Sequence, residues 1–408
     1  MYDDPVACWA RSGAMALSGR PDGPPLVAPG APASYAARRL AAFAAAAAAR
    51  RGAFDLAAHG LDTGVLGERA AIAGLTRQGP RSCGGAFRTM PTTDGWLGLS
   101  LPRPDDIEMV PALIEAVVDA DPWQAVADWA ADHPTGDAVA RAHLLGLAAA
   151  AWPPAPSRRP GVVLTEGATR QPRERPLVVD LTSLWAGPLC AHLLGLAGCR
   201  VVKVESTGRL DGARFGPAGF YDLLHAAHES VTLDFADPSD VHRLRELIGR
   251  ADLVLEASRP RALQSLGILA EDHVAAGTTW VSITARGRAS DTIGFGDDVA
   301  LAAGLAVPDG TGLLPVGDAL ADPLAGLAAA AAAAEALLPR TARLVDVSML
   351  HVAEEAAARP AHEATVIRRD GEWWVETASG LHPVEPPRAR RPSGTAAQPG
   401  ADNPRWWR

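Results

Sequence analysis

The sequence predicts an α/β fold, with a Rossmann-like large domain on a parallel sheet and a smaller α+β domain. From Pro176 onward, short apolar runs alternate with helical patterns, which implies right-handed crossovers between parallel strands. Residues 75–150 differ, because the strand-like GWLGLSL precedes two helical segments, IEMVPALIEAVV and WQAVADWAADH. The length of 408 residues suits two or three domains.

The large domain is the most regular part of the sequence. Its predicted strands are 177–182, 200–205, 252–257 and 279–285, and its predicted helices include 190–198 and 241–251. In open parallel sheets, ligands bind beyond the carboxyl ends of the strands. Here those ends are residues 185–188, 205–211, 258–260 and 286–287.

The remaining segments follow from composition. We expect residues 1–58 to hold a Gly/Pro-rich stretch and then an Ala-rich helix. Residues 151–175 are rich in Pro and Arg and predict a linker before the large domain at 176–355. Residues 356–408 predict a hairpin in VIRRDGEWWVE, followed by a polar, Pro-rich tail.

Composition and charge exclude several classes of partner. The formal net charge is −9 and no long Lys/Arg run interrupts it, so we expect no nucleic-acid partner and no anionic membrane partner. The four cysteines are scattered without Cys/His ligand spacing, which predicts reduced thiols and no metal. MYDDPVACWARSG does not resemble a signal peptide, and the Ala-rich runs are too short to span a bilayer. These features favour a cytoplasmic protein.

Asp322 is the main candidate for a catalytic carboxylate. ALADPLAGLAAAAAAAEALL predicts a long helix with Asp322 at the N-cap and Pro323 at the first helical position. A capping role alone explains this pattern. The same position favours a carboxylate, and the small side chains of Ala321, Ala325 and Gly326 leave room for a bulky substrate. A cap and a nucleophile both remain open from these residues.

An internal repeat connects the two Ala-rich helices. Residues 21–49 align without gaps with residues 308–336, sharing the tripeptide PDG and a mid-loop glycine, Gly30 or Gly317. Tyr35 stands opposite Asp322 in this alignment. We expect the two segments to share a loop-then-helix geometry, with Ser34 as the cap of the first helix.

The motifs of residues 176–352 resemble the class III coenzyme A-transferase (CaiB/BaiF) family. LVVDLTSLWAGPLCAHLLGLAGCRVVKVES resembles the opening of that family, and SVTLDFADPSDVHRLRELIGRADLVLEASRPRALQSLGI resembles the stretch that follows. WVSITARG, GDDVALAAG, GDALADPLAGLAAA and RLVDVSML continue in register. Residues 82–130 resemble the family's smaller domain. The resemblance implies the CoA-transferase family III fold.

The resemblance also implies a reaction and a set of residues. The acid matching Asp322 would attack an acyl-CoA thioester, forming first a mixed anhydride and then an aspartyl-CoA thioester. Asp318, four residues earlier, falls outside the motif. The other implied site residues are Asp297 as an assisting acid, Ala186, Gly187 and Pro188 at the turn beside the thioester, and Lys203 and Arg259 at CoA phosphates. Each has a plainer interpretation, as a loop acid, an ordinary turn or a surface cation.

Three positions depart from the family pattern and put CoA contacts in doubt. His228-Glu229 replaces a basic pair, Ala257-Ser258 replaces an Asn-aromatic pair, and Ser265 replaces a basic residue along the adenine. The substrates implied are an acyl-CoA and a carboxylic acid. Because small-domain sequence precedes the large domain, we expect either the family's homodimer or an internal pseudo-dimer.

Two alternatives to a transferase remain. The first is an α-methylacyl-CoA racemase-like isomerase, which needs a base on each face of the α-carbon. Related racemases place a His just before the acid that matches Asp297, where this chain has Gly296. The second is a catalytically inactive CoA-binding partner, suggested by Tyr35 and the altered contacts.

Overall fold

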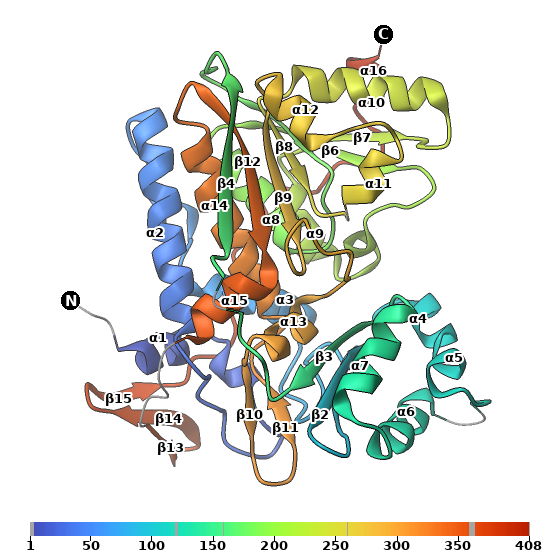
Figure 1. Cartoon of the computed structure of the whole chain (residues 1–408). Coiled ribbons are helices and arrows are strands. Elements are labelled where there is room, and N and C mark those ends of the chain that lie inside the picture. The colour runs from blue at the N-terminus through green and yellow to red at the C-terminus, as the bar shows by residue number, and fades with distance from the viewer. Residues whose placement is uncertain (1–3, 119–120, 158, 259, 359–363, 408) are drawn as a thin grey trace.

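A seven-stranded sheet forms the centre of the computed structural model, which describes residues 4–118, 121–157, 159–258, 260–358 and 364–407 (Figure 1). The strand order is β4-β12-β9-β8-β5-β6-β7. All neighbours pair in parallel except β4, which is antiparallel to β12 at one edge. The strands are β4 (Val162–Thr169), β5 (Leu177–Asp180), β6 (Arg200–Ser206), β7 (Glu229–Leu233), β8 (Leu253–Glu256), β9 (Thr279–Thr284) and β12 (Thr341–Ser348).

This order confirms the predicted fold class. The parallel strands run outward in both directions from β5, the first of them in the chain, which is the Rossmann-like arrangement. All four predicted strands are present, and their observed bounds differ by at most two residues from the prediction. Short apolar runs were sufficient to predict these strands, because a strand of a parallel sheet is buried on both faces.

Helices cover both faces of the sheet. One face carries α2 (Pro32–Arg51), α8 (Ala186–Leu196), α14 (Ala321–Ala336) and α15 (Met349–Ala357), and the other carries α10 (Pro238–Arg250) and α12 (Ala270–Ala275). Neighbouring residues of β5 alternate between these layers, since Val178 packs with the first group and Val179 with the second. The remaining helices of this part are α9 (Ala218–His225), α11 (Pro260–Gln264) and α13 (Gly296–Ala302).

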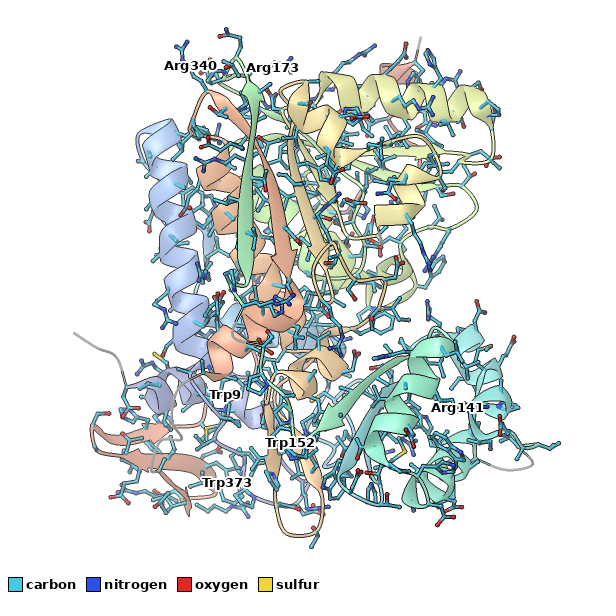
Figure 2. The ribbon with its side chains drawn as sticks, viewed as in Figure 1. Trp9, Arg141, Trp152, Arg173, Arg340 and Trp373 are labelled. Carbon is cyan, nitrogen blue, oxygen red and sulfur yellow. The ribbon has the colours of Figure 1, made fainter. Side chains whose placement is uncertain are left out.

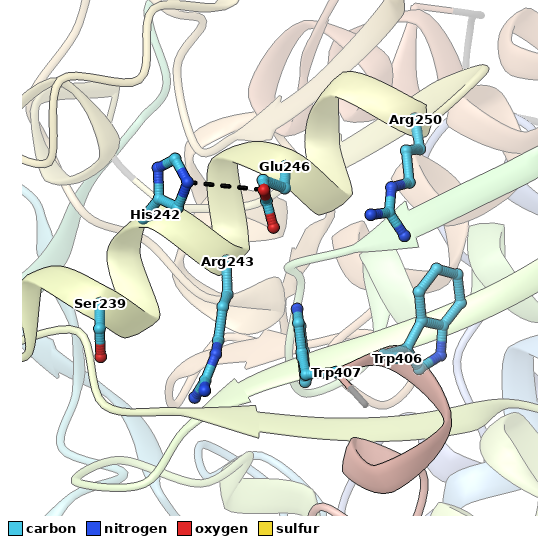
Figure 3. A pocket seen from close by; sticks show the side chains of 7 residues that line it. All are labelled: Ser239, His242, Arg243, Glu246, Arg250, Trp406 and Trp407. Carbon is cyan, nitrogen blue, oxygen red and sulfur yellow. Dashed lines mark ion pairs between the residues drawn. The ribbon is translucent and has the colours of Figure 1, made fainter.

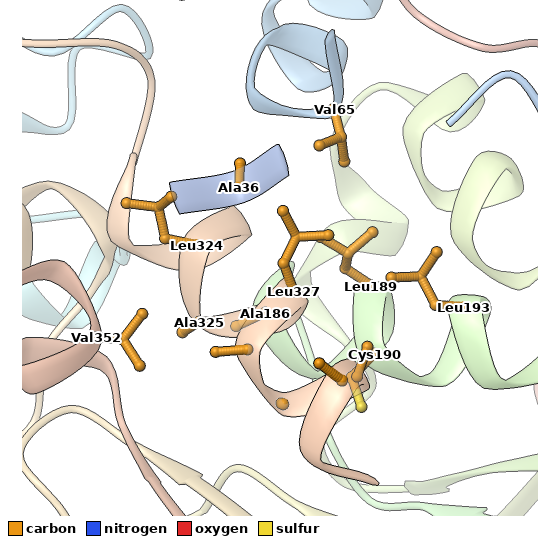
Figure 4. Close-up of a cluster of buried hydrophobic side chains, with 14 of the residues drawn as sticks. Ala36, Val65, Ala186, Leu189, Cys190, Leu193, Leu324, Ala325, Leu327 and Val352 are labelled. Atoms are coloured by element: carbon orange, nitrogen blue, oxygen red, sulfur yellow. The ribbon is translucent and has the colours of Figure 1, made fainter. Parts of the chain in front are cut away.

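Small side chains allow α8 and α14 to pack unusually closely. A Cβ built on Gly326 would lie 2.7 Å from the carbonyl oxygen of Ala186 and 3.1 Å from Leu189. Such distances leave space for hydrogen only. Figure 4 shows Leu327 of α14 between Leu189 of α8 and Ala36 of α2, and Leu324 beside Ala36. The first turns of α8 and α14 therefore lie against each other, at the carboxyl ends of the strands.

A small domain forms a separate α+β layer (Figure 1). Its antiparallel strands are β1 (Phe87–Pro91), β2 (Trp96–Ser100) and β3 (Ala148–Trp152), and its helices are α4 (Pro104–Glu108), α5 (Val110–Ile114), α6 (Pro122–Ala131) and α7 (Thr135–Leu144). Trp152 lies where β3 meets the hairpin β10 (Ala306–Pro308) and β11 (Leu313–Pro315), as Figure 2 shows. Phe87 and Leu301 join the same contact, which connects this domain to the large one.

The first part of the described chain contains α1 (Pro5–Arg11), α2 and α3 (Glu68–Ala73), and the last contains β13 (Thr365–Arg369), β14 (Glu372–Thr377), β15 (Gly380–Pro383) and α16 (Asn403–Trp406). The β13–β15 sheet near the end of the chain packs against α1, whereas α16 packs against β7 (Figure 1). The predicted hairpin is present, with β15 as a third strand. Within the described residues, no helix combines the length and apolar character that crossing a membrane requires.

The structure corrects the predicted linker at 151–175. Residues 162–169 form β4, which pairs with β12. This strand lies at the sheet edge and most of its side chains are exposed, so it lacks the apolar run that marks a buried strand. The segments on either side of β4 are rich in Pro and Arg, which indicated a linker rather than a strand.

The repeat is visible in the backbone but not in the predicted cap. Gly30 and Gly317 both adopt left-handed conformations, with φ of +68° and +74°, and each precedes an Ala-rich helix. The expectation that Ser34 caps α2 is wrong. The helix begins at Pro32, which places Ser34 inside the first turn, where its buried hydroxyl has no hydrogen-bond partner among the described residues.

The tight helix crossing yields a stability prediction. Gly326→Ala should destabilise the protein by about 1–3 kcal/mol, because the new methyl group would overlap the Ala186 carbonyl and force the helices apart. The matched control is Gly249→Ala in α10, where nothing lies within 4 Å of the added Cβ. That change should stabilise by up to about 1 kcal/mol through helix propensity. Urea unfolding of both variants checks this, and similar shifts in both would contradict the packing argument.

Candidate active site

Asp322 follows a strained turn at the start of α14. Ala319 has a left-handed φ of +43°, which costs a non-glycine residue about 1 kcal/mol. The backbone N–H of Asp322 donates to the carbonyl of Ala319 at 2.9 Å. The helix begins at Ala321, so Asp322 is its second residue and Leu320 is the N-cap.

The predicted N-cap role of Asp322 is therefore wrong. Leu320 already has helical backbone angles, and the helix starts two residues earlier than the Asp-Pro pair suggests. Throughout the described part of the chain, no backbone N–H or side chain donates a hydrogen bond to the Asp322 carboxylate. The side chain is partly buried rather than enclosed. A carboxylate without donors at a helix start is free to act chemically.

One arginine and three further aspartates surround Asp322. Arg69, from α3, donates its Nε–H to Asp318 Oδ2 at 2.9 Å and its Nη2–H to Asp318 Oδ1. Asp318 is fully buried, so this bidentate pair holds its charge inside the protein. Burial lowers the pKa of Arg69, but Asp318, Asp297 and Asp322 raise it further, and the net shift is upward.

Asp297 supports the strained turn. Its Oδ1 accepts a hydrogen bond from the Ala319 N–H at 2.9 Å. Burial and the nearby charge of Asp318 raise the pKa of Asp297 to about 7, against opposing effects of Arg69 and that hydrogen bond. The predicted assisting acid thus lies beside Asp322 and fixes the turn that presents it.

Burial also raises the pKa of Asp322 to about 7. Arg69 lowers it, whereas Asp297, Asp298 and Asp318 raise it. Because Asp318 already neutralises Arg69, the guanidinium compensates only part of the remaining negative charge. Near neutral pH the Asp322 carboxyl is therefore divided between its protonated and ionised forms.

The small domain reaches this cluster through two contacts. Ser100, the last residue of β2, donates its hydroxyl to Asp298 Oδ1 at 2.9 Å. The Cys83 thiol lies 3.5 Å from the Gly317 carbonyl oxygen, and a Cβ on Gly84 would lie 3.6 Å from Arg69 Nη2. The cluster is thus assembled from both domains of a single chain.

Gly296 closes one side of the cluster. A Cβ at this position would lie 2.2 Å from the Ala319 carbonyl oxygen and 2.6 Å from Asp322 Oδ2. Any side chain here would displace the turn or the acid. The absence of a His at position 296, noted in the sequence, is thus also a steric requirement of this backbone.

Ala186, Gly187 and Pro188 form the first turn of α8 rather than a separate turn before it. A Cβ on Gly187 would lie 2.2 Å from the Cβ of Thr182, so the backbone passes directly over that side chain. Through the contact of Ala186 with Gly326, this turn lies one helical turn from Asp322. The three residues therefore lie near the cluster, and their predicted role beside the thioester stays a prediction.

The two predicted phosphate contacts fare differently. Lys203 is buried, with its ammonium 2.9 Å from Asp211 Oδ2 and donating also to the Thr182 carbonyl. This burial contradicts a contact with CoA phosphates, because the lysine's charge is already paired internally. Arg259 lies outside the described residues, and its prediction stays untested.

Three members of the cluster were not among the predicted site residues: Arg69, Asp298 and Asp318. Arg69 comes from a segment that carried no motif, more than two hundred residues from Asp318 in sequence. Asp298 and Asp318 stand within the quoted segments GDDVALAAG and GDALADPLAGLAAA, but their buried surroundings are a tertiary property. No local sequence pattern distinguishes them from solvated acids.

A separate hollow of about 420 Å³ lies between α10 and α16 (Figure 3). Its lining residues are Ser239, His242, Arg243, Glu246, Arg250, Trp406 and Trp407. Trp406 and Trp407 pack on the α10 side of the sheet, whereas α14 covers the opposite face. This hollow is therefore not part of the aspartate cluster.

Residues 176–382 match the family described as CoA-transferase family III, and the chain belongs to that family. The match includes α8, α13 and α14, and therefore Asp297, Asp298, Asp318 and Asp322. It leaves out Arg69 and the small domain, which complete the cluster.

Curated relatives are similar over shorter stretches. Human succinyl-CoA:glutarate CoA-transferase is 31% identical over 29% of this chain and 29% of its own length. Acetyl-CoA:oxalate CoA-transferase of Acetobacter aceti is 29% identical over 26% of this chain and 29% of its own length. The matched region thus spans less than a third of either relative. A crystal structure of a hypothetical protein from Mycobacterium tuberculosis has 28% identity and a TM-score of 0.44, over 50% of this chain and 64% of that one.

The raised pKa values predict how stability depends on pH. Asp322 binds its proton more tightly in the folded protein (pKa about 7) than at its ordinary value of 3.8. The stability it contributes is complete below pH 3.8 and is lost as the pH rises toward 7. Asp322→Asn cannot titrate, so its melting temperature should exceed that of the wild type by an increasing margin from pH 4 to pH 8.

Thermal unfolding across this pH range tests the prediction. The control is Asp128→Asn, which removes one charge from the exposed side of α6. A margin that is constant with pH, or equally large in the control, would show that burial does not disfavour the Asp322 carboxylate.

Proposed function

We propose that this chain transfers CoA from an acyl-CoA thioester to a carboxylic acid, with Asp322 as the nucleophile. The observation that carries the proposal is the donor-free Asp322 carboxylate, presented by a strained turn and surrounded by residues of both domains. Its family membership and the names of its relatives, which are CoA-transferases, support the same reaction class.

The proposed reaction begins with attack of an Asp322 oxygen on the thioester carbonyl carbon. The C–S bond breaks, CoA leaves as a thiolate, and an aspartyl-acyl anhydride forms. The thiolate then attacks the aspartyl carbonyl, which releases the donor carboxylate and leaves an aspartyl-CoA thioester. The acceptor carboxylate repeats these steps in reverse, so that the new acyl-CoA forms and Asp322 is regenerated.

The surroundings of Asp322 suit this exchange. A desolvated carboxylate is a stronger nucleophile than a hydrated one, and partial burial limits the water that would hydrolyse the anhydride. Arg69 favours the ionised form that attacks. Asp297, by holding the Ala319 N–H, would keep Asp322 in one orientation through successive steps.

The racemase alternative is less well supported. Proton exchange at the α-carbon needs a base on each face, and a His at position 296 would supply one of them. The Gly296 backbone lies so close to Asp322 that it admits no side chain. We therefore favour covalent transfer over proton exchange.

The first copy of the repeat supports one active site per chain. Tyr35 is buried, and its hydroxyl donates to Glu355 Oε2 at 3.1 Å while Arg39 lies over its ring. Burial raises the pKa of Tyr35, so the phenol stays protonated and cannot replace the acid. Because the Asp322 cluster draws on both domains of one chain, we propose an internal pseudo-dimer in which this half is inert.

Replacing Asp322 tests the mechanism directly. Asp322→Ala should abolish CoA transfer and leave the circular-dichroism spectrum unchanged, because the side chain caps nothing. The wild type, incubated with a panel including succinyl-CoA and acetyl-CoA and then with hydroxylamine, should carry an adduct on the peptide containing Asp322. Asp128→Ala is the matched control and should keep full activity. Transfer that persists in Asp322→Ala would refute the proposed nucleophile.

A second substitution tests the single-site claim. Tyr35→Phe should leave transfer unchanged and reduce stability by about 0.5–1.5 kcal/mol, the worth of its hydrogen bond to Glu355. Calorimetric titration should give one CoA site per chain in both proteins. Two sites per chain, or loss of activity in a folded Tyr35→Phe variant, would contradict an inert first copy.

A further inference from the structure

Two histidines and an aspartate meet in the interior near the end of β5. Asp180 is the last residue of β5, His225 ends α9, and His228 directly precedes β7. All three side chains are buried, and one potential ligand atom from each lies within 4.8 Å of the others. We propose that Asp180, His225 and His228 bind one zinc ion.

The two imidazoles already have the spacing of zinc ligands. His225 Nδ1 and His228 Nδ1 are 3.2 Å apart. Two nitrogens bound to tetrahedral Zn²⁺ at about 2.0–2.1 Å are separated by about 3.3 Å. Tyr221 stacks on the His225 ring at 4.3 Å between centroids and fixes the plane of that imidazole. The two nitrogens share a hydrogen bond, which a bound ion would replace.

The site also contains buried polar atoms without partners. Asp180 Oδ2 and His225 Nε2 accept and donate no hydrogen bond within the described residues. Leaving a buried oxygen or nitrogen unsatisfied usually costs about 1–3 kcal/mol. The other Asp180 oxygen accepts the backbone N–H and the hydroxyl of Thr182, which orient the carboxylate as an outer-shell partner would. A metal ion would satisfy the free oxygen.

Lys203 is a buried cation beside the proposed zinc site. Its ammonium lies 2.9 Å from Asp211 Oδ2 but 3.9 Å from Asp180 Oδ2, which is beyond hydrogen-bond distance. Lys203 thus donates to Asp211 and forms only a longer ion pair with Asp180, so Asp180 Oδ2 has no hydrogen-bond donor among the described residues and can accept an ion. A set of two neutral imidazoles and one carboxylate suits Zn²⁺ better than Mg²⁺ or Ca²⁺, which prefer oxygen ligands.

The ion would have a structural role. It would link the end of β5 to the end of α9 and the start of β7, which belong to the connection between β6 and β7. Thr182, held by Asp180, lies beneath Gly187 in the first turn of α8. Fixing Asp180 therefore stabilises the support of α8. The sequence predicts no metal, and this proposal departs from that prediction because Asp180 is remote in sequence from both histidines.

Metal analysis of the full-length protein tests the site. The protein is stripped with a chelator, dialysed, titrated with zinc sulfate and examined by elemental mass spectrometry. We expect one zinc per chain and a melting temperature that rises with free zinc. X-ray absorption at the zinc edge should show nitrogen and oxygen ligands with imidazole scattering and no sulfur. Failure to retain zinc, or a sulfur-containing shell, would overturn the proposal without any variant.

Substitutions locate the ion. His228→Gln and His225→Gln should each weaken zinc binding by more than about 100-fold. The matched control is His242→Gln, because His242 is exposed on α10 beside Glu246 and should not affect the site. Zinc retained at full affinity in both ligand variants, or lost in the control, would place the ion elsewhere and overturn the assignment. If the ligand variants do not fold, the absorption spectrum of the wild type still decides.

Discussion

The contact between the backbones of α8 and α14 constrains much of this structure. Gly326 allows the Ala186 carbonyl to approach to a distance that a methyl group would forbid. The helices are therefore fixed relative to each other by main-chain atoms, which cannot change rotamer. Asp322 starts one helix and Ala186–Pro188 start the other, so this contact sets where the acid lies relative to the strand ends. Alanines along α14 extend the same close packing toward α2.

The aspartate cluster shows how an unfavourable arrangement can be maintained. Asp297, Asp318 and Asp322 share one neighbouring arginine, Arg69, and the bidentate pair with Asp318 already neutralises that arginine. The pKa values of Asp297, Asp298 and Asp322 are raised, so these carboxyls bind protons more tightly. Ala319 adds backbone strain at the same place. The extensive apolar core around α14 offsets these costs, which is common where strain and charge accompany function.

The repeat explains why the N-terminal part packs where it does. Both copies place a left-handed glycine before an Ala-rich helix, and the two helices pack side by side (Figure 1). They have diverged in the side chains that follow the glycine. Tyr35 donates a hydrogen bond to Glu355, whereas Asp322 accepts none from the residues that the structure describes. The segment after the first copy contributes Arg69, so part of the cluster depends on a region outside the family match.

The sequence by itself determined the parallel sheet, and it identified Asp322 as the candidate acid. Buried parallel strands are apolar on both faces, so their runs are legible without tertiary information. It did not reveal β4, because an exposed edge strand has no such pattern. Tertiary structure alone decided that Asp322 is not a cap, that Lys203 is internal, and that Arg69 and Asp298 join the cluster. These properties arise from long-range contacts and from desolvation, which depend on residues distant in the chain.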